Sequence, residues 1–102
     1  MLRFEWDPQK AASNLRKHGI SFEIATHVFD DPFVLSSIER IEQGEERWQA
    51  IGNVDGFLLV LVVHTVREES EHDLSIETIR IISAREADKK ERKRYEQETR
   101  PL

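Results

Sequence analysis

The run Val54 to Val63, VDGFLLVLVV, constrains the fold of this chain more than any other stretch. Asp55-Gly56 separates two β-type segments, and such a dipeptide favours a type I′ hairpin turn because both residues tolerate positive φ. The strand after the turn is predicted over Phe57 to about Arg67. Its middle is apolar at odd and even positions alike, which indicates a central strand covered on both faces or covered by a partner.

Other β-type segments flank this hairpin. The pattern predicts strands over Phe33 to Ile41, Arg47 to Val54 and Thr78 to Ile82, with a turn at Gln43-Gly44. Residues 68–77, EESEHDLSIE, carry five acids and no Lys or Arg. This segment is expected to form a long acidic connection between the last two strands.

Two helices are predicted before the strands, after a short extended segment over Phe4 to Trp6. Asp7 suits an N-cap and Pro8 the first helical position, and Gly19 ends the helix that runs to His18. Ser21 is expected to cap the second helix, which Asp30-Asp31-Pro32 closes.

A third helix is predicted from Ser83 to about Thr99. Ser83 and Glu86 fit the S-x-x-E capping box, which would place Arg85 in the first helical turn. A cation is disfavoured at that end of a helix dipole. Arg85 therefore either faces solvent, or pairs with an acid, or holds a bound anion.

Composition limits the class of protein. A chain of 102 residues supports one compact domain, here expected over residues 1–102. No apolar run approaches the roughly 18 residues of a membrane span and no signal peptide is visible, so we expect a cytoplasmic protein without membrane contacts. Without cysteine, disulfides and Cys-based zinc sites are excluded. The four histidines lack metal-ligand spacing, so neither a metal nor another cofactor is expected.

The net charge of −5 argues against a simple basic nucleic-acid binder, but it hides a local asymmetry. Arg85 to Arg100 carries seven Lys or Arg residues against five acids. Candidate functional groups lie at the ends of the predicted elements. Thr65 and Arg67 share one face of their strand. Lys17 and His18 end a helix, where they could serve as cap-stabilising cations, and Glu46 and Arg47 could form a surface ion pair.

Four motifs in order resemble the BrnT family of bacterial type II toxins. They are FEWDPQKAASNLRKHGISFEIATHVFDDP, GEERWQAIG, the apolar strand ending in HTVR, and RIISAREADKKERKRYE, which together span nearly the whole chain. The resemblance implies an α+β, RelE-like fold: two N-terminal helices packed on a four-stranded, mainly antiparallel sheet, followed by a C-terminal helix. It also implies a ribonuclease that cleaves RNA without a metal and arrests growth.

The same resemblance implies partners. A BrnA-like antitoxin would neutralise the toxin, and the complex would reach operator DNA through the antitoxin. The apolar central strand and the thinly apolar last helix suggest surface that another chain covers, so a homodimer is a further alternative.

Site residues are carried over by motif. Lys17 and His18 match the family's KHG, and Arg67 matches the arginine after its central strand. The remaining matches are Glu46, Arg47 and Trp48 in ERW, and Ser83 and Arg85 in SAR. Metal-free RNA cleavage needs a base, an acid and cations around the phosphorane.

We therefore expect Arg85 and Arg67 to hold phosphate oxygens. Histidine ordinarily titrates near neutrality, which makes His18 the expected general base or acid, with Glu46 as the alternative and Lys17 as a further catalytic cation. Arg47, Trp48 and Ser83 are expected to contact substrate. Trp48 could instead be a half-buried sheet residue.

One departure from the family pattern bears on activity. The acidic segment 68–77 replaces a short turn, and carboxylates beside an RNA groove would repel phosphates. A non-catalytic module that only pairs with an antitoxin is the alternative function.

Overall fold

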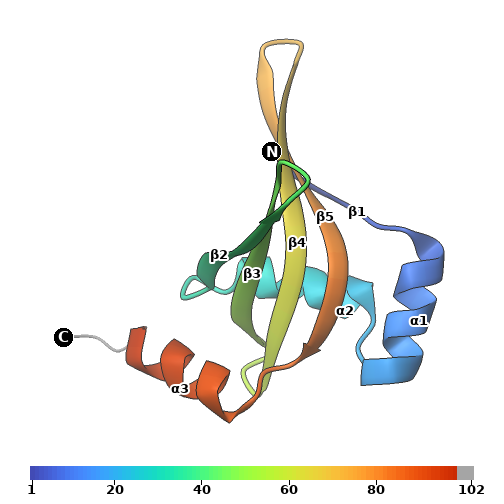
Figure 1. The fold of residues 1–102 in the computed structure, drawn as a ribbon. Coiled ribbons are helices and arrows are strands. Elements are labelled where there is room, and N and C mark those ends of the chain that lie inside the picture. The colour runs from blue at the N-terminus through green and yellow to red at the C-terminus, as the bar shows by residue number, and fades with distance from the viewer. Residues whose placement is uncertain (99–102) are drawn as a thin grey trace.

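The computed structural model describes residues 1–98 (Figure 1). The elements in chain order are β1 Leu2–Glu5, α1 Pro8–His18, α2 Phe22–Ala25, the 3-10 helix η1 Thr26–Asp30, β2 Leu35–Glu42, β3 Glu45–Val54, β4 Leu58–Glu71, β5 Leu74–Glu86 and α3 Lys89–Glu98. The predicted end of the last helix at Thr99 lies outside the described residues. Within residues 1–98, no helix combines the length and the apolar character that crossing a membrane requires.

The first helix begins and ends where its capping residues predict. The Asp7 carboxylate accepts the backbone N–H of Gln9 at 2.8 Å, and Pro8 occupies the first turn. Gly19 adopts a φ of 72°, and its N–H donates to the Leu15 carbonyl at 2.9 Å. The left-handed glycine thus satisfies a carbonyl that the helix end would otherwise leave unpaired.

The second predicted helix is one α-helical turn followed by a 3-10 turn. Ser21 caps it as expected, accepting the N–H of Ile24 at 3.1 Å. The backbone of η1 then packs closely against β3. A Cβ atom added at Gly52 of β3 would lie only 2.7 Å from the carbonyl oxygen of Val28 in η1. Glycine at position 52 therefore permits the close approach of η1 to the sheet.

The sheet has five strands in the order β1-β5-β4-β3-β2, not the four predicted. β1 adds the fifth strand, parallel to β5, with Phe4 opposite Ile79. The other neighbours are antiparallel, and β4 is the central strand, as its apolar run predicts. The sequence predicted this segment only as a short extended stretch over Phe4 to Trp6, because four residues at a chain end carry little periodic signal.

The acidic segment is not a connection. β4 and β5 continue through it as a hairpin, with Glu68 opposite Glu77 and Ser70 opposite Ser75. His72 and Asp73 form the turn, with φ of 52° and 64°. Figure 1 shows this arm projecting beyond the rest of the molecule. The ladder begun in the apolar part of β4 extends into the acidic part, so pairing overrides the low β-propensity of glutamate.

The last helix begins later than predicted, at Lys89, and Ser83 is not its N-cap. Ser83, Ala84 and Arg85 belong to β5, where Ser83 pairs with Val63. The capping box is formed instead by Asp88 and Glu91. The Asp88 carboxylate accepts the N–H of Glu91 at 2.8 Å, and the Glu91 carboxylate accepts the N–H of Asp88 at 2.9 Å. Pairing with the central strand thus overrides the local S-x-x-E pattern.

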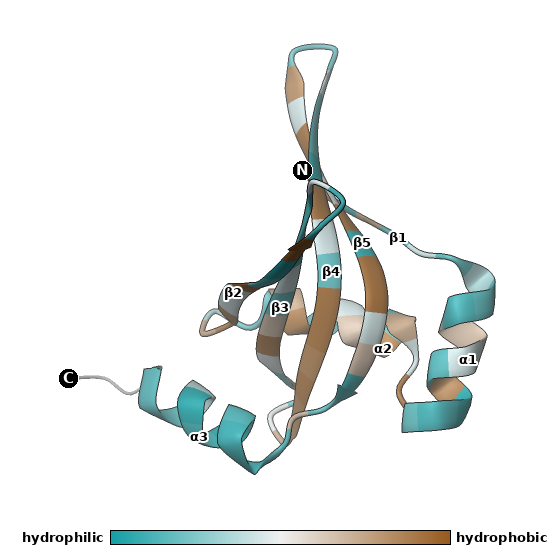
Figure 2. Ribbon diagram, viewed as in Figure 1, coloured by the Kyte–Doolittle hydropathy of each residue, from teal (hydrophilic) through white to brown (hydrophobic). Residues whose placement is uncertain are grey.

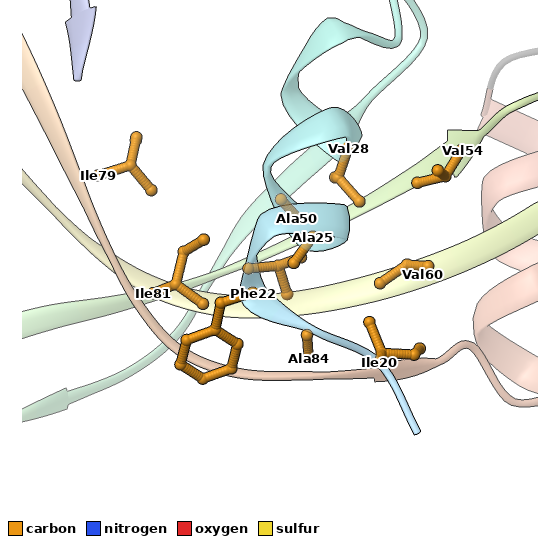
Figure 3. Close-up of a cluster of buried hydrophobic side chains, with 11 residues drawn as sticks. Ile20, Phe22, Ala25, Val28, Ala50, Val54, Val60, Ile79, Ile81 and Ala84 are labelled. Carbon is orange, nitrogen blue, oxygen red and sulfur yellow. The ribbon is translucent and has the colours of Figure 1, made fainter. Parts of the chain in front are cut away.

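Apolar residues pack on both faces of β4. On one face, α2 and η1 cover a cluster that includes Phe22, Val60, Val62 and Ile81 (Figure 3). On the other face, Leu59 and Leu61 pack with residues that include Ile51, Ala87 and the partly buried Tyr95 of α3. We call the first side the helix face. The side chains of each strand alternate between the two faces.

Candidate nucleic-acid interface

All six arginines of the strands project from the sheet face opposite α1, α2 and η1. Residues that lie directly opposite one another on paired strands point to the same side of the sheet. Thr78 lies opposite both Arg3 and Arg67, so these two arginines share a side. Arg40 likewise lies opposite Arg47. A register shift at Ile82 brings Arg85 to the same side as Arg80. We call this side the basic face. Its arginines are Arg3, Arg40, Arg47, Arg67, Arg80 and Arg85.

Arg67 and Arg85 share this face but do not meet. Arg85 pairs with Leu61, six residues before Arg67 on β4, which corresponds to about 20 Å along the strand. A single phosphate therefore cannot contact both arginines. The expectation that Arg67 and Arg85 hold oxygens of one phosphate is wrong in this geometry, because antiparallel pairing separates the two residues along β4 and β5.

Arg67 lies in an exposed ion-pair cluster. Its Nη2 donates to the Glu5 carboxylate at 2.8 Å, and its Nε donates to Glu69. Arg80 donates to the other oxygen of Glu5 at 2.8 Å. The hydrogen bonds from Arg67 and Arg80 lower the pKa of Glu5, and those to Glu5 and Glu69 raise the pKa of Arg67. The cluster ties β1 to β4 and β5.

Arg85 forms a bidentate pair with Glu91 of α3. Its Nη1 and Nη2 donate to the two Glu91 oxygens at 2.8 Å each, and this pairing lowers the pKa of Glu91. Of the alternatives that the sequence left open, the structure shows Arg85 paired with an acid. The expected place of Arg85 in the first turn of a helix is wrong, since Arg85 is a strand residue facing that helix.

Lys17, His18 and Ser83 come together at the free edge of β5. The three residues line one hollow between the end of α1 and the strand. Ser83 also belongs to the basic face, because it lies on the same side as Arg85, two residues away on β5. Three of the residues expected from sequence are therefore contiguous, and Ser83 connects them to Arg85.

Asn14 of α1 positions this hollow, although the sequence analysis did not single it out. Its side chain is buried, donates to the Ala84 carbonyl at 2.8 Å and accepts the Ala84 N–H at 3.1 Å. A further bond to the Ile20 carbonyl measures 3.0 Å. Asn14 thus pairs with the β5 edge beyond the end of β1, as a neighbouring strand would, and fixes α1 beside Ser83.

The three residues of the ERW motif divide between the two faces. Arg47 lies on the basic face and pairs with Glu42 at 3.3 Å. Glu46 and Trp48 point to the helix face, by alternation. Glu46 is exposed opposite Ile41, and Trp48 is partly buried opposite Ile38 and His64. The structure therefore does not bring Glu46 or Trp48 to Arg85, and Trp48 matches the alternative of a half-buried sheet residue.

The last helix borders the basic face and is held by polar contacts. It is hydrophilic along its length (Figure 2). The Tyr95 hydroxyl donates to the Asp31 carboxylate at 2.5 Å, and Arg94 donates to the Ser37 hydroxyl at 3.3 Å. Burial and the bond to Asp31 raise the pKa of Tyr95 to about 12. Together with Arg85 and Glu91, these contacts keep α3 against the sheet despite its few apolar side chains.

His64 is a buried polar residue that sequence reasoning did not single out. It is 3% exposed, and burial lowers its pKa. Its Nδ1 lies 3.3 Å from the Thr65 carbonyl, whereas its buried Nε2 has no hydrogen-bond partner. Alternation after Val62 predicts that His64 faces the helix side, but nothing in the sequence reveals an unpaired nitrogen there. Over residues 1–98, no three His, Asp or Glu side chains are grouped so that they could hold a metal ion.

Comparisons with known proteins agree with this fold. A crystal structure at 1.1 Å resolution of the Brucella abortus ribonuclease toxin, BrnT, is similar with a TM-score of 0.57 and 21% identity, covering 87% of this chain and 100% of that chain. No curated protein sequence matches. The family model described as the ribonuclease toxin BrnT of type II toxin-antitoxin systems matches residues 6–91. Because this match spans most of the chain, the chain belongs to the BrnT family of ribonuclease toxins of type II toxin-antitoxin systems.

Proposed function

We propose that this chain is a metal-independent endoribonuclease that binds RNA across the basic face. The observation that carries the proposal is the one-sided placement of the six strand arginines. Guanidinium groups suit the phosphates of RNA through paired N–H donors. Glu69 and Glu71 project from the same side of the arm and disfavour phosphate there. RNA therefore lies toward the α3 end of the face.

The reacting phosphate is assigned to the surroundings of Ser83. This residue lines the hollow that Lys17 and His18 share, and it neighbours Arg85 on β5. A cationic fork, a second cation and an imidazole then surround one position at the edge of the sheet. Arg67 lies too far along β4 to act there, and serves to hold a more distant phosphate of the same strand.

The chemistry follows from these groups. The 2′-hydroxyl loses its proton to His18, and its oxygen bonds to the adjacent phosphorus. The bond from phosphorus to the 5′-oxygen breaks, and that oxygen takes a proton from water, while the proton on His18 returns to solvent. Arg85 and Lys17 stabilise the charge on the phosphorane oxygens. The products are a 2′,3′-cyclic phosphate and a 5′-hydroxyl.

The alternative base, Glu46, gains no support from this arrangement, because it projects from the helix face. Arg47 lies on the basic face and is suited to substrate contact once it leaves Glu42. Trp48 faces away from the proposed RNA path.

The partner in this proposal is a BrnA-like antitoxin encoded beside the chain, through which the complex reaches operator DNA. One observation favours the alternative, a non-catalytic module that pairs with an antitoxin: Arg67 and Arg85 both hold carboxylates of this chain. If these pairs never open, neither arginine is free to bind phosphate.

The test is cleavage of a single-stranded RNA by the free chain in the presence of a chelator. The proposal expects products with cyclic phosphate ends, and no cleavage of a substrate carrying a 2′-deoxy sugar at the scissile position. The His18→Ala variant should lose cleavage by a factor on the order of 10²–10⁴ while remaining folded. Cleavage that requires an added metal ion would contradict the proposal. So would equal cleavage of the substrates with and without the 2′-hydroxyl.

A further inference from the structure

The helix face of the sheet is covered only in part. Figure 1 shows α2 and η1 behind the lower half of the sheet, whereas the β4–β5 arm and the β2–β3 hairpin extend beyond them. On this uncovered part, Ile38 is 48% exposed, Ile41 67% and Val66 39%. These residues project from the same side as Trp48, by register. Together with Trp48 we call them the apolar patch.

A pocket of about 290 Å³ opens within the apolar patch. Its lining residues are Phe29, Ser36, Trp48, His64, Val66, Glu77 and Ile79. The Thr65 carbonyl only accepts hydrogen bonds, so the proton of the neutral His64 ring belongs on Nδ1. The buried Nε2 is then an acceptor without a partner. This nitrogen has almost no accessible surface, so a partner reaches it only if the His64 ring turns. The pocket therefore suits an apolar side chain.

The rim of the apolar patch is acidic. Glu46, Glu68 and Glu77 project from this side, by register, whereas no strand arginine within residues 1–98 does. Carboxylates of this kind repel a phosphate backbone and attract Lys and Arg side chains. The two faces of the same sheet thus differ in the partner that each can accept.

We propose that the apolar patch is the docking surface for an amphipathic segment of the antitoxin, rich in Lys or Arg and anchored by an apolar side chain in the pocket beside Trp48 and Val66. The inference rests on the proposed function for the existence of that partner, and it adds the place where the partner binds. Exposed apolar side chains clustered around a formed pocket are what a protein partner buries. The antitoxin segment and the RNA then occupy opposite faces of the sheet.

The experiment measures the affinity of purified, folded variants for the antitoxin encoded beside this chain. Two variants alter the apolar patch or its acidic rim: Ile38→Ser in the patch and Glu68→Lys in the rim. Two controls make the same kinds of change on the opposite side of the arm. They are Leu74→Ser, at a residue 62% exposed, and Glu71→Lys.

The proposal expects each patch variant to weaken antitoxin binding by roughly tenfold or more, and each control to change it by about twofold or less. All four should keep the thermal midpoint of the parent. Equal affinity of patch and control variants would overturn the proposal. It would also fail if the parent bound no antitoxin, if Ile38→Ser altered only self-association, or if the lysine variant changed only RNA binding.

Cleavage of RNA by the same free variants separates the two proposals. The docking surface is supported if Ile38→Ser binds antitoxin weakly and still cleaves RNA as the parent does. A second outcome is that neither the parent nor any variant cleaves RNA, while only the patch variants bind the antitoxin more weakly. The ribonuclease proposal then fails, and the docking-surface proposal is still supported.

Discussion

Arg85 of β5 and Glu91 of α3 are joined by two parallel hydrogen bonds, each 2.8 Å long. Glu91 also accepts the N–H of Asp88 at the start of α3. The same carboxylate therefore caps the helix and holds the arginine proposed to bind phosphate. Arg85 must exchange Glu91 for the phosphate when RNA binds, so this pair sets how readily the site opens.

A first prediction concerns the acid stability of this pair. The pKa of Glu91 is lowered by Arg85, so the stabilisation from its charge is present above its ordinary pKa of 4.5 and is lost as pH falls through the lowered value. Glu91→Gln retains the capping pattern but removes the charge. We expect its thermal midpoint to fall below the parent's at neutral pH, with the difference shrinking below about pH 4.5. A difference independent of pH would contradict the pairing.

A second prediction uses the only tyrosine of the chain. The pKa of Tyr95 is raised to about 12, so the stabilisation from its neutral hydroxyl is complete below pH 10 and disappears as pH approaches 12. Absorbance of the tyrosinate should therefore titrate near 12 in the folded chain. In Asp31→Asn the midpoint should move toward 10. A tyrosinate midpoint near 10 in the parent would show that the Tyr95 hydroxyl does not bond to Asp31 and so does not hold α3 to it.

A third prediction concerns Asn14. Asn14→Leu leaves the N–H and carbonyl of Ala84 and the carbonyl of Ile20 without this partner, at a cost of about 1–3 kcal/mol for each buried group left unsatisfied. Denaturant unfolding should show this loss, and RNA cleavage should fall because α1 carries Lys17 and His18. Gln9→Ala, at an exposed position of α1 that does not line the hollow, is the control and should change neither the stability nor the cleavage rate.

A fourth prediction concerns the turn of the acidic arm. His72 and Asp73 both have positive φ, a region that disfavours side chains with a Cβ. Replacing them by Asn and Gly should stabilise the arm by about 1 kcal/mol. Amide exchange at Ser70 and Ser75 should slow accordingly. Asp55→Asn, in a turn that already contains glycine, should leave exchange in the arm unchanged.

Local signals in the sequence predicted the parts of the fold that local chemistry determines. Asp7, Pro8 and Gly19 fixed α1 because caps act within one turn, and Asp55-Gly56 fixed the central hairpin because both residues adopt positive φ, 56° and 82°. The apolar run of β4 predicted its central position. These features require no knowledge of distant contacts.

The errors arose where long-range pairing outweighs local preference. Ser83 reads as a helix cap, yet the ladder with Val63 keeps it in β5, and Asp88 caps the helix instead. For the candidate site, the family resemblance suggested Lys17, His18, Ser83 and Arg85, and the structure places these four residues near one edge of β5. Sequence reasoning could not settle how far Arg67 lies from Arg85, since antiparallel pairing separates the two residues whereas an intervening strand or connection could bring them together.

The measurement that tests the central claim most directly compares RNA cleavage by Arg85→Ala and Glu91→Gln. If Arg85 holds the reacting phosphate, Arg85→Ala should lower the cleavage rate by a factor on the order of 10²–10³, while Glu91→Gln, which frees the arginine, should cleave at least as fast as the parent. Arg85→Lys should recover little, because a point charge does not replace a bidentate fork. If Arg85 only attaches α3 to the sheet, the two variants should lose stability and cleavage in parallel. Such parallel losses, or a fully active Arg85→Ala protein, would contradict the account.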